Sequence, residues 1–102
     1  MTLSERQKKH LRRLGHALHP IVALGQPGLT DAVVKEMDRA LTDHELVKVR
    51  ARVGEREARD AMLDQLAART GSELVQRIGN VGLFYRRNKD DTASSIILPD
   101  GP

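Results

Sequence analysis

Basic side chains are concentrated near the start of this 102-residue chain. Residues 1 to 20 hold five Lys or Arg side chains against Glu5 alone, whereas residues 29 to 43 hold two basic and four acidic side chains. Positive charge that is segregated on a domain with a net charge of only +3 favours a polyanionic partner. A charge run taken alone is more simply explained as the solvated face of a helix. The side chains that we expect to contact phosphates here are Lys8, Lys9, Arg12, Arg13 and His16.

A glycine-bounded loop, Gly25-Gln26-Pro27-Gly28, follows the apolar run of residues 21–24. Glycine lacks a Cβ and therefore lets a phosphate backbone approach the main chain closely. Four-residue G-x-x-G loops in some nucleic-acid-binding domains clamp nucleotides in this way, although two glycines around a turn usually mark only a turn. Gln26 can donate to a phosphate or sugar, but Pro27 has no N–H to offer.

Residues 45 to 53 alternate between apolar and basic side chains. This period of two predicts a strand that is buried on one face and basic on the other. The apolar side comprises Val47, Val49, Ala51 and Val53, and the basic side comprises Lys48, Arg50 and Arg52. We expect the three basic residues to join the cations of the first segment in neutralising phosphates.

The chain has two aromatic residues, Phe84 and Tyr85, and no Trp. Adjacent residues of a strand point to opposite faces, so these rings cannot form a sheet platform that stacks several bases. Recognition should then depend on phosphate, sugar and shape. A structural role for Tyr85 is favoured over contact with a nucleic acid.

Histidines and acidic residues indicate neither a metal site nor a catalytic site. His10, His16 and His19 match no compact zinc pattern, and the chain has no Cys. His44 and Glu45 precede a strand without a paired nucleophile, which favours a structural role such as helix termination. We therefore expect no metal, no cofactor and no enzymatic activity.

The first helix is predicted by a capping box, in which Ser4 and Gln7 satisfy each other's backbone N–H groups. Leu11, Leu14 and Leu18 then recur with helical spacing and predict the core-facing side. Gly15 should weaken the helix by about 1 kcal/mol relative to Ala.

The remaining pattern predicts an α/β domain with the element order α-β-α-β-α-β-β and one mixed four-stranded sheet. Thr30 or Asp31 is expected to cap the second helix, and the third should run over residues 55–70 with Gly71 after its end. The strands are expected at 21–24, which should be buried, at 45–53, and at 74–78 and 81–86 with a tight turn near Gly79-Asn80.

We expect residues 1–87 to form the domain and residues 88–102 a loosely ordered polar tail, with a short strand at 95–98. The chain has no run of about 18 apolar residues that would span a membrane, and no apolar leader. These features predict a cytoplasmic protein, and we also expect a monomer.

Several short motifs together resemble the YhbY-type family of stand-alone CRM domains (chloroplast RNA splicing and ribosome maturation). They run in order from near the start of the chain to about residue 87. The matching residues are Leu3-Ser4, Gln7-Lys8, His10-Leu11, Leu14, His16, Leu18, Pro20, Val22 to Gly25, Gly28-Leu29-Thr30, Ala40-Leu41, His44 to Val49 and Tyr85-Arg86.

This resemblance implies a fold like that of the C-terminal domain of bacterial translation initiation factor three. It also implies RNA binding through the loop glycines Gly25 and Gly28, with the first-helix cations flanking the loop. We expect Arg86 to contact the RNA as well. Stand-alone bacterial members associate with precursors of the large ribosomal subunit, so the leading hypothesis is a ribosome-assembly factor that binds large-subunit rRNA. The alternative is a protein-interaction module whose basic helix docks an acidic ribosomal protein or assembly partner. An enzyme that acts on RNA has little support.

Overall fold

Three helices and four strands follow one another in the order predicted from the sequence. The computed structural model describes residues 2–88 and 96–99. The elements are α1 (Glu5–Gly15), β1 (Pro20–Leu24), α2 (Asp31–His44), β2 (Leu46–Ala51), α3 (Arg56–Thr70), β3 (Glu73–Ile78) and β4 (Val81–Tyr85).

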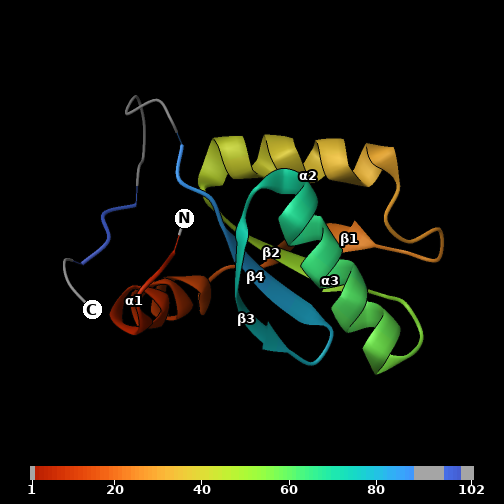
Figure 1. Cartoon of the computed structure of the whole chain (residues 1–102), viewed down its shortest axis with the longest axis horizontal. Coiled ribbons are helices and arrows are strands. Elements are labelled where there is room, and N and C mark those ends of the chain that lie inside the picture. Colours follow the sequence, from red (N-terminus) through yellow and green to blue (C-terminus); the bar gives the residue numbers. More distant parts are fainter. Residues whose placement is uncertain (1, 89–95, 100–102) are drawn as a thin grey trace.

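The strands form one mixed sheet in the order β1-β2-β4-β3, as Figure 1 shows. β1 and β2 are parallel and are joined by the crossover helix α2, whereas β4 runs antiparallel between β2 and β3. The predicted tight turn at Gly79 and Asn80 joins β3 to β4, and Gly79 has φ +57°. Because β1 and β2 are parallel, their carboxyl ends lie at the same edge of the sheet.

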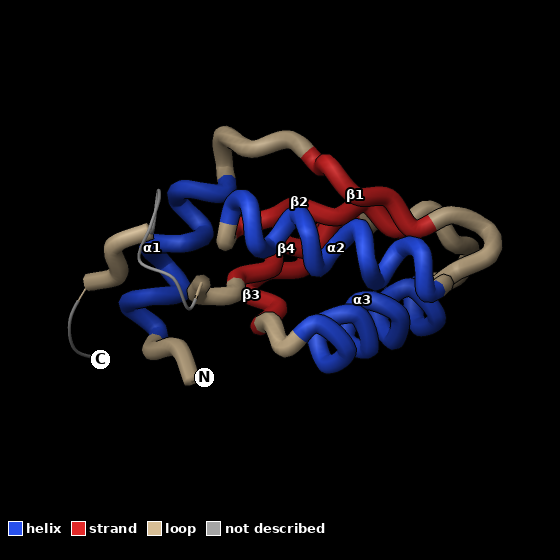
Figure 2. The backbone as a smooth tube through the Cα atoms, turned by 90° about the horizontal axis from the view of Figure 1, so that it is seen from above, coloured by secondary structure: helices blue, strands red, loops and turns tan. Residues whose placement is uncertain are grey.

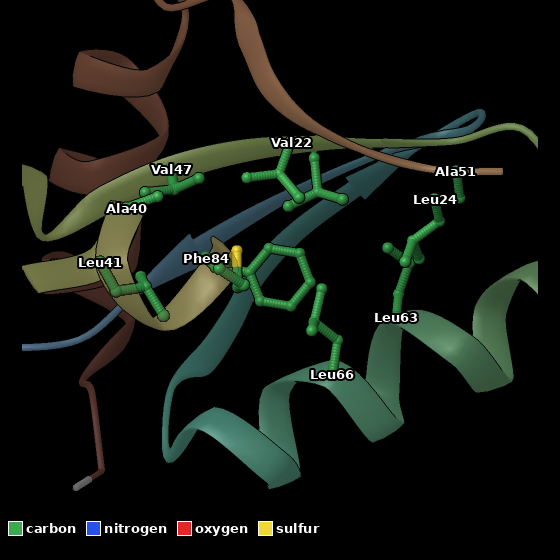
Figure 3. Close-up of a cluster of buried hydrophobic side chains, with 11 residues drawn as sticks. Val22, Leu24, Ala40, Leu41, Val47, Ala51, Leu63, Leu66 and Phe84 are labelled. Atoms are coloured by element: carbon green, nitrogen blue, oxygen red, sulfur yellow. The ribbon is translucent and has the colours of Figure 1, made fainter. Parts of the chain in front are cut away.

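Helices α2 and α3 cover one face of the sheet (Figure 2). Figure 3 shows Phe84 in the middle of the cluster between them, with Leu66 of α3 on one side and Val22 of β1 on the other. The buried members of this cluster are Val22, Leu24, Met37, Ala40, Leu41, Val47, Val49, Ala51, Leu63, Leu66 and Phe84. Met37, Ala40 and Leu41 form the buried face of α2.

Helix α1 packs on the other face of the sheet, where Leu11 and Tyr85 belong to a second buried cluster. Gly15 lets the helix approach closely, because a Cβ there would lie 2.6 Å from Cδ2 of Leu83. The prediction that Leu14 and Leu18 face the core is wrong, since they are 40% and 38% exposed. The helix ends at Gly15, so its stripe does not continue to residue 18.

Strand β1 lies at the edge of the sheet and is buried on one face only. Val22 and Leu24 point into the core, whereas Ala23 is exposed and Ile21 is 51% exposed. The prediction of a fully buried strand is therefore wrong, because α1 covers parts of β2, β3 and β4 and leaves the outer face of β1 uncovered.

The residues that were predicted to cap or end the helices do so in the structure. Ser4 and Gln7 form the capping box of α1, with N···O distances of 3.1 and 2.9 Å. Thr30 caps α2 by accepting from the N–H of Val33, and Gly71 ends α3 in the left-handed conformation. In α3 the buried stripe contains Leu63 and Leu66, whereas Ala58 is exposed.

Residues 96–99 pack beside α1 without forming a strand. Ile96 and Leu98 contact the second cluster, and the carbonyl of Pro99 accepts from the side chain of Gln7. The predicted strand at 95–98 is thus not formed at 96–98, and residue 95 lies outside the described residues. The buried carboxylate of Glu45 holds this segment by accepting from the N–H of Ile96 at 2.7 Å and of Asn88 at 2.8 Å.

Candidate nucleic-acid interface

The loop between β1 and α2 is a closed turn. The N–H of Gly28 donates to the carbonyl of Gly25 at 2.9 Å, which leaves Gln26 and Pro27 exposed at the tip. The cap that Thr30 provides starts α2 directly after this turn. The tip side chains are therefore the parts of the loop that a ligand meets first.

The two loop glycines have different surroundings. A Cβ at Gly25 would meet only the Cδ of Pro27, at 3.8 Å, so Gly25 leaves room for a ligand. Gly28 is buried at φ +76°, and a Cβ there would lie 3.2 Å from Cε of Met62. The backbone conformation and the contact with α3 explain Gly28, whereas Gly25 has the open surface that close approach by a phosphate needs.

Arg52 is fixed next to this loop by the backbone. Its N–H donates to the carbonyl of Leu24 at 2.7 Å, so the residues that follow β1 and β2 are joined at one edge of the sheet. The N–H of Ala51 donates in turn to the carbonyl of Asn80 at 2.7 Å. Three connecting segments thus lie at the same end of the molecule (Figure 1). The side chain of Arg52 is exposed.

Lys48 and Arg50 lie on the α1 side of the sheet, as the alternation predicted. Lys48 is opposite Leu83 and Arg50 is opposite Val81 in the antiparallel ladder, and both cations are half-buried. Residues two apart on a strand are separated by about 6.6 Å and share a face, so these cations form a row that leads toward Arg52. The exposed Ala23 of β1 pairs with Arg50 and leaves this row accessible from the edge.

The first-helix cations lie away from the loop. Lys9, Arg13 and His16 are exposed, whereas Lys8 and Arg12 are half-buried, and Lys8 is 4.0 Å from Glu5. Figures 1 and 2 show α1 and the loop toward opposite ends of the longest dimension, which is 39 Å. The expectation that these cations flank the loop is therefore wrong, because β1 runs away from the end of α1 for five residues at about 3.3 Å each.

The Arg86 side chain makes its hydrogen bonds within the protein. Its guanidinium donates to Oδ1 of Asp38 at 2.6 Å and to the carbonyls of Thr70 and Asp38 at 2.9 and 3.0 Å. A fourth bond, at 3.0 Å, goes to the hydroxyl of Thr42. These bonds tie the end of β4 to α2 and α3, so we assign Arg86 to the fold in place of the expected RNA contact.

Both aromatic side chains are buried on opposite faces, as the strand pattern predicted. Tyr85 is 1% exposed, which agrees with the favoured structural role. Burial raises the pKa of Tyr85, the charge of Glu45 raises it further, and Arg87 opposes the rise. Glu45 is also structural, because it ends α2 and holds the two backbone N–H groups described above.

Across residues 2–88 and 96–99, no three His, Cys, Asp or Glu side chains are placed to hold a metal ion together. In the same ranges no helix is long and apolar enough to cross a membrane.

Three arginines that the sequence analysis did not select converge beside the turn between β3 and β4. Arg56 and Arg59 come from α3 and Arg77 comes from β3, and they line one pocket. No periodic pattern links them, because they come from a helix and a strand that only the tertiary fold brings together.

Comparison with known proteins identifies one domain family and several relatives. The profile of the CRS1/YhbY (CRM) domain family matches residues 3–86. The chain is 47% identical over 88 residues to a Pseudomonas aeruginosa protein named "Probable RNA-binding protein", covering 86% of this chain and 85% of that one. It is 38% identical over 98 residues to a Haemophilus influenzae protein named "RNA-binding protein", covering 96% of each chain.

A solved structure has the same fold. The solution structure of a Staphylococcus aureus protein superposes with a TM-score of 0.81 and is 34% identical in sequence. The match covers 96% of this chain and 100% of that chain.

Proposed function

The chain belongs to the CRS1/YhbY (CRM) domain family, and from this premise we propose that it binds RNA and assists assembly of the large ribosomal subunit. The proposed binding surface comprises the Gly25–Gly28 loop and the row of Lys48, Arg50 and Arg52. The names of the Pseudomonas and Haemophilus relatives support RNA as the partner. The large-subunit precursor is proposed from the resemblance to the YhbY-type family.

The observation that carries this proposal is the 2.7 Å hydrogen bond between the Arg52 N–H and the Leu24 carbonyl. It holds the backbone of Arg52, whose side chain is exposed, against Leu24, the residue that precedes the open glycine of the loop. Parallel pairing of β1 with β2 directs both segments to one edge, and Lys48 and Arg50 extend the positive surface along the sheet.

This surface suits the sugar–phosphate backbone of RNA better than its bases. Guanidinium groups bind phosphate oxygens through two N–H groups at once, and Gly25 leaves room for the backbone. Stacking of bases on a Phe or Tyr ring is unavailable here, because Phe84 and Tyr85 are both buried. We therefore propose recognition by charge and shape, with sequence tolerance as its consequence.

The test is the salt dependence of RNA binding. For single-stranded RNA the logarithm of affinity should fall with the logarithm of salt at a slope of about −0.7 per neutralised phosphate. The double variant Arg50→Gln/Arg52→Gln should therefore lose about 1.4 units of slope. The matched control is Lys35→Gln/Arg39→Gln, which removes the same charge from exposed positions of α2. Equal loss in both variants would reject the proposed surface.

The first-helix cations provide a second contact region for a longer RNA. Lys9, Arg13 and His16 are exposed on α1 and lie toward the opposite end of the molecule. We propose that they contact a separate stretch of the same rRNA. A protein-interaction module remains the second candidate, because the basic face of α1 would also suit an acidic partner.

Nuclease treatment separates these candidates. Association with large-subunit precursor particles should disappear after RNA digestion if the chain binds rRNA, and it should survive if an acidic protein holds it. Crosslinking in cells followed by sequencing of the bound RNA would identify the site. We further propose a cytoplasmic location and a monomeric state, and size-exclusion chromatography with light scattering tests the latter.

A further inference from the structure

A pocket of about 360 Å³ opens where the start of α3 meets the turn between β3 and β4. Its wall contains three guanidinium groups and one carboxylate. The lining residues are Arg56, Arg59, Asp60, Arg77 and Gly79. None of the arginines belongs to the surface proposed above.

The Arg77 guanidinium is held at the pocket by α3. Its Nη1 lies 3.6 Å from Oδ1 of Asp60 and 3.3 Å from the Asp60 carbonyl, and its Nη2 lies 3.4 Å from Oδ1 of Asp64. These contacts are long for charge-assisted hydrogen bonds, which are usually about 2.7–2.9 Å. They orient the side chain without using the full donor capacity of a group that carries five N–H donors.

Arg59 contributes a donor that the protein itself does not satisfy. Its Nε is buried, and within the part of the chain that the structure describes it has no hydrogen-bond partner. A buried donor without a partner is unfavourable, and a turn of the Arg59 side chain toward an acceptor in the pocket would relieve this.

Two further features make the pocket suitable for an anion. Glu55, the N-cap residue of α3, makes no side-chain capping bond, so the first N–H groups of the helix keep donor capacity, although Glu57 places a carboxylate in the same turn. Three arginines outnumber the two carboxylates that contact them, Asp60 and Asp64, and planar guanidinium groups match the geometry of phosphate oxygens.

The pocket and the Gly25–Gly28 loop contact α3 at different positions around its axis. Met62 packs toward Gly28, whereas Asp60 contacts Arg77. Residues two apart on a helix differ by about 200° around its axis, so Asp60 lies far around α3 from Met62. Arg59 is three residues before Met62 and lies on a neighbouring face, so the pocket extends around α3 toward the loop. One strand of RNA can reach both by passing over the first turns of α3.

We propose that this pocket is a second phosphate-binding site, which takes a phosphate group of the RNA strand bound at the loop. This inference rests on the proposed function. Arg59 supplies the donor from within the pocket, and Arg56 and Arg77 bind from its rim.

The test compares the binding of one fluorescently labelled single-stranded RNA by the full chain and by Arg59→Gln/Arg77→Gln. We expect roughly fivefold to tenfold weaker binding and a salt slope that is smaller by about 0.7, because one phosphate contact is lost. Arg59→Lys, which keeps the charge and loses the planar fork, should weaken binding about threefold. The charge-matched control Lys35→Gln/Arg39→Gln should change affinity less than twofold, and thermal unfolding should show that each variant remains folded.

The outcomes separate the two proposals. If Arg59→Gln/Arg77→Gln behaves like the control while Arg50→Gln/Arg52→Gln still weakens binding, the pocket is only an ion-pair network and this inference is overturned. If the wild-type chain does not bind RNA, the proposed function fails first. The measurement is repeated with the same RNA carrying a 5′-hydroxyl or a 5′-phosphate. If the pocket binds a backbone phosphate, Arg59→Gln/Arg77→Gln weakens the binding of both RNAs equally. If it binds a terminal phosphate, the variant weakens the binding of the 5′-phosphorylated RNA alone.

Discussion

Met62 occupies the space beside Gly28 where any other residue would have a side chain. The expected distance from a Cβ at Gly28 to Cε of Met62 is 3.2 Å, and φ there is +76°. Gly28→Ala should therefore lower the free energy of unfolding by about 1–2 kcal/mol. Gly25→Ala is the matched control, because its added Cβ enters open space and should change stability by less than about 0.5 kcal/mol. Chemical denaturation of both variants tests this difference, and equal stability would show that Met62 yields without loss.

The two loop glycines also separate an effect on folding from an effect on RNA binding. Gly25→Ala adds a methyl group on the open side of the loop, where we propose that the RNA backbone approaches. It should weaken RNA binding about threefold to tenfold while the fold is retained, a range of about 0.7–1.4 kcal/mol. Fluorescence anisotropy with single-stranded RNA measures this, and unchanged affinity would place the backbone elsewhere.

Glu45 should contribute stability through its buried carboxylate. Both of its oxygens accept backbone N–H groups, and the residue is 1% exposed. Glu45→Gln removes the charge and one acceptor oxygen, so we expect a loss of about 2 kcal/mol and faster hydrogen exchange at the Ile96 amide. Glu36→Gln, at an exposed position of the same helix, is the control and should have little effect on either measurement.

Tyr85 should make stability fall at alkaline pH. Its pKa is raised by burial from the usual 10.0, so above about pH 10 the unfolded chain loses the phenol proton before the folded chain does. The contribution of the protonated Tyr85 side chain to the free energy of unfolding is fully present below the pKa of the unfolded chain. It is lost as the pH rises through the pKa of the folded chain. Urea unfolding at increasing pH measures this, and the absorbance of the single tyrosine reports its ionisation directly.

Tyr85→Phe isolates that contribution. The Tyr85 hydroxyl is buried, and no described residue is its hydrogen-bond partner. The variant should be as stable as the wild type at neutral pH, or up to about 1 kcal/mol more stable. Its stability should also fall less steeply above about pH 10. An identical alkaline profile in the two proteins would rule out Tyr85 as the cause.

Arg86 should affect stability without affecting RNA affinity. Arg86→Lys keeps the charge but loses most of the four hydrogen bonds to Asp38, Thr42 and Thr70, so unfolding should become easier by about 2 kcal/mol. Arg87→Lys is the neighbouring exposed control. A selective loss of RNA binding by folded Arg86→Lys would restore Arg86 to the interface.

Local signals predicted most of the fold. The capping residues Ser4 and Thr30, the left-handed Gly71 and the turn at Gly79 act through bonds or dihedral angles within a few residues, so they can be recognised in the sequence. The alternation in β2 likewise depends only on the period of a strand, and Lys48 and Arg50 lie on the face that it predicted.

Residues whose surroundings come from distant segments were harder to predict. Gly15 was expected to be a weak point of α1, but its role depends on Leu83, which lies 68 positions later. The burial of Gly28 depends on Met62, and the assignment of Arg86 depends on bonds to two helices. The separation of the α1 cations from the loop follows from the direction of β1, which the spacing of charges does not encode.

The packing of residues 96–99 beside α1 has a practical consequence for joining this domain to other proteins. Leu3 and Leu98 contact the same cluster, so both ends of the described chain meet on one side of the sheet, far from the Gly25–Gly28 loop (Figure 1). Neighbouring termini are what domain insertion and circular permutation require. The domain can therefore be inserted into a longer polypeptide, or used in tandem, with the loop end left unobstructed.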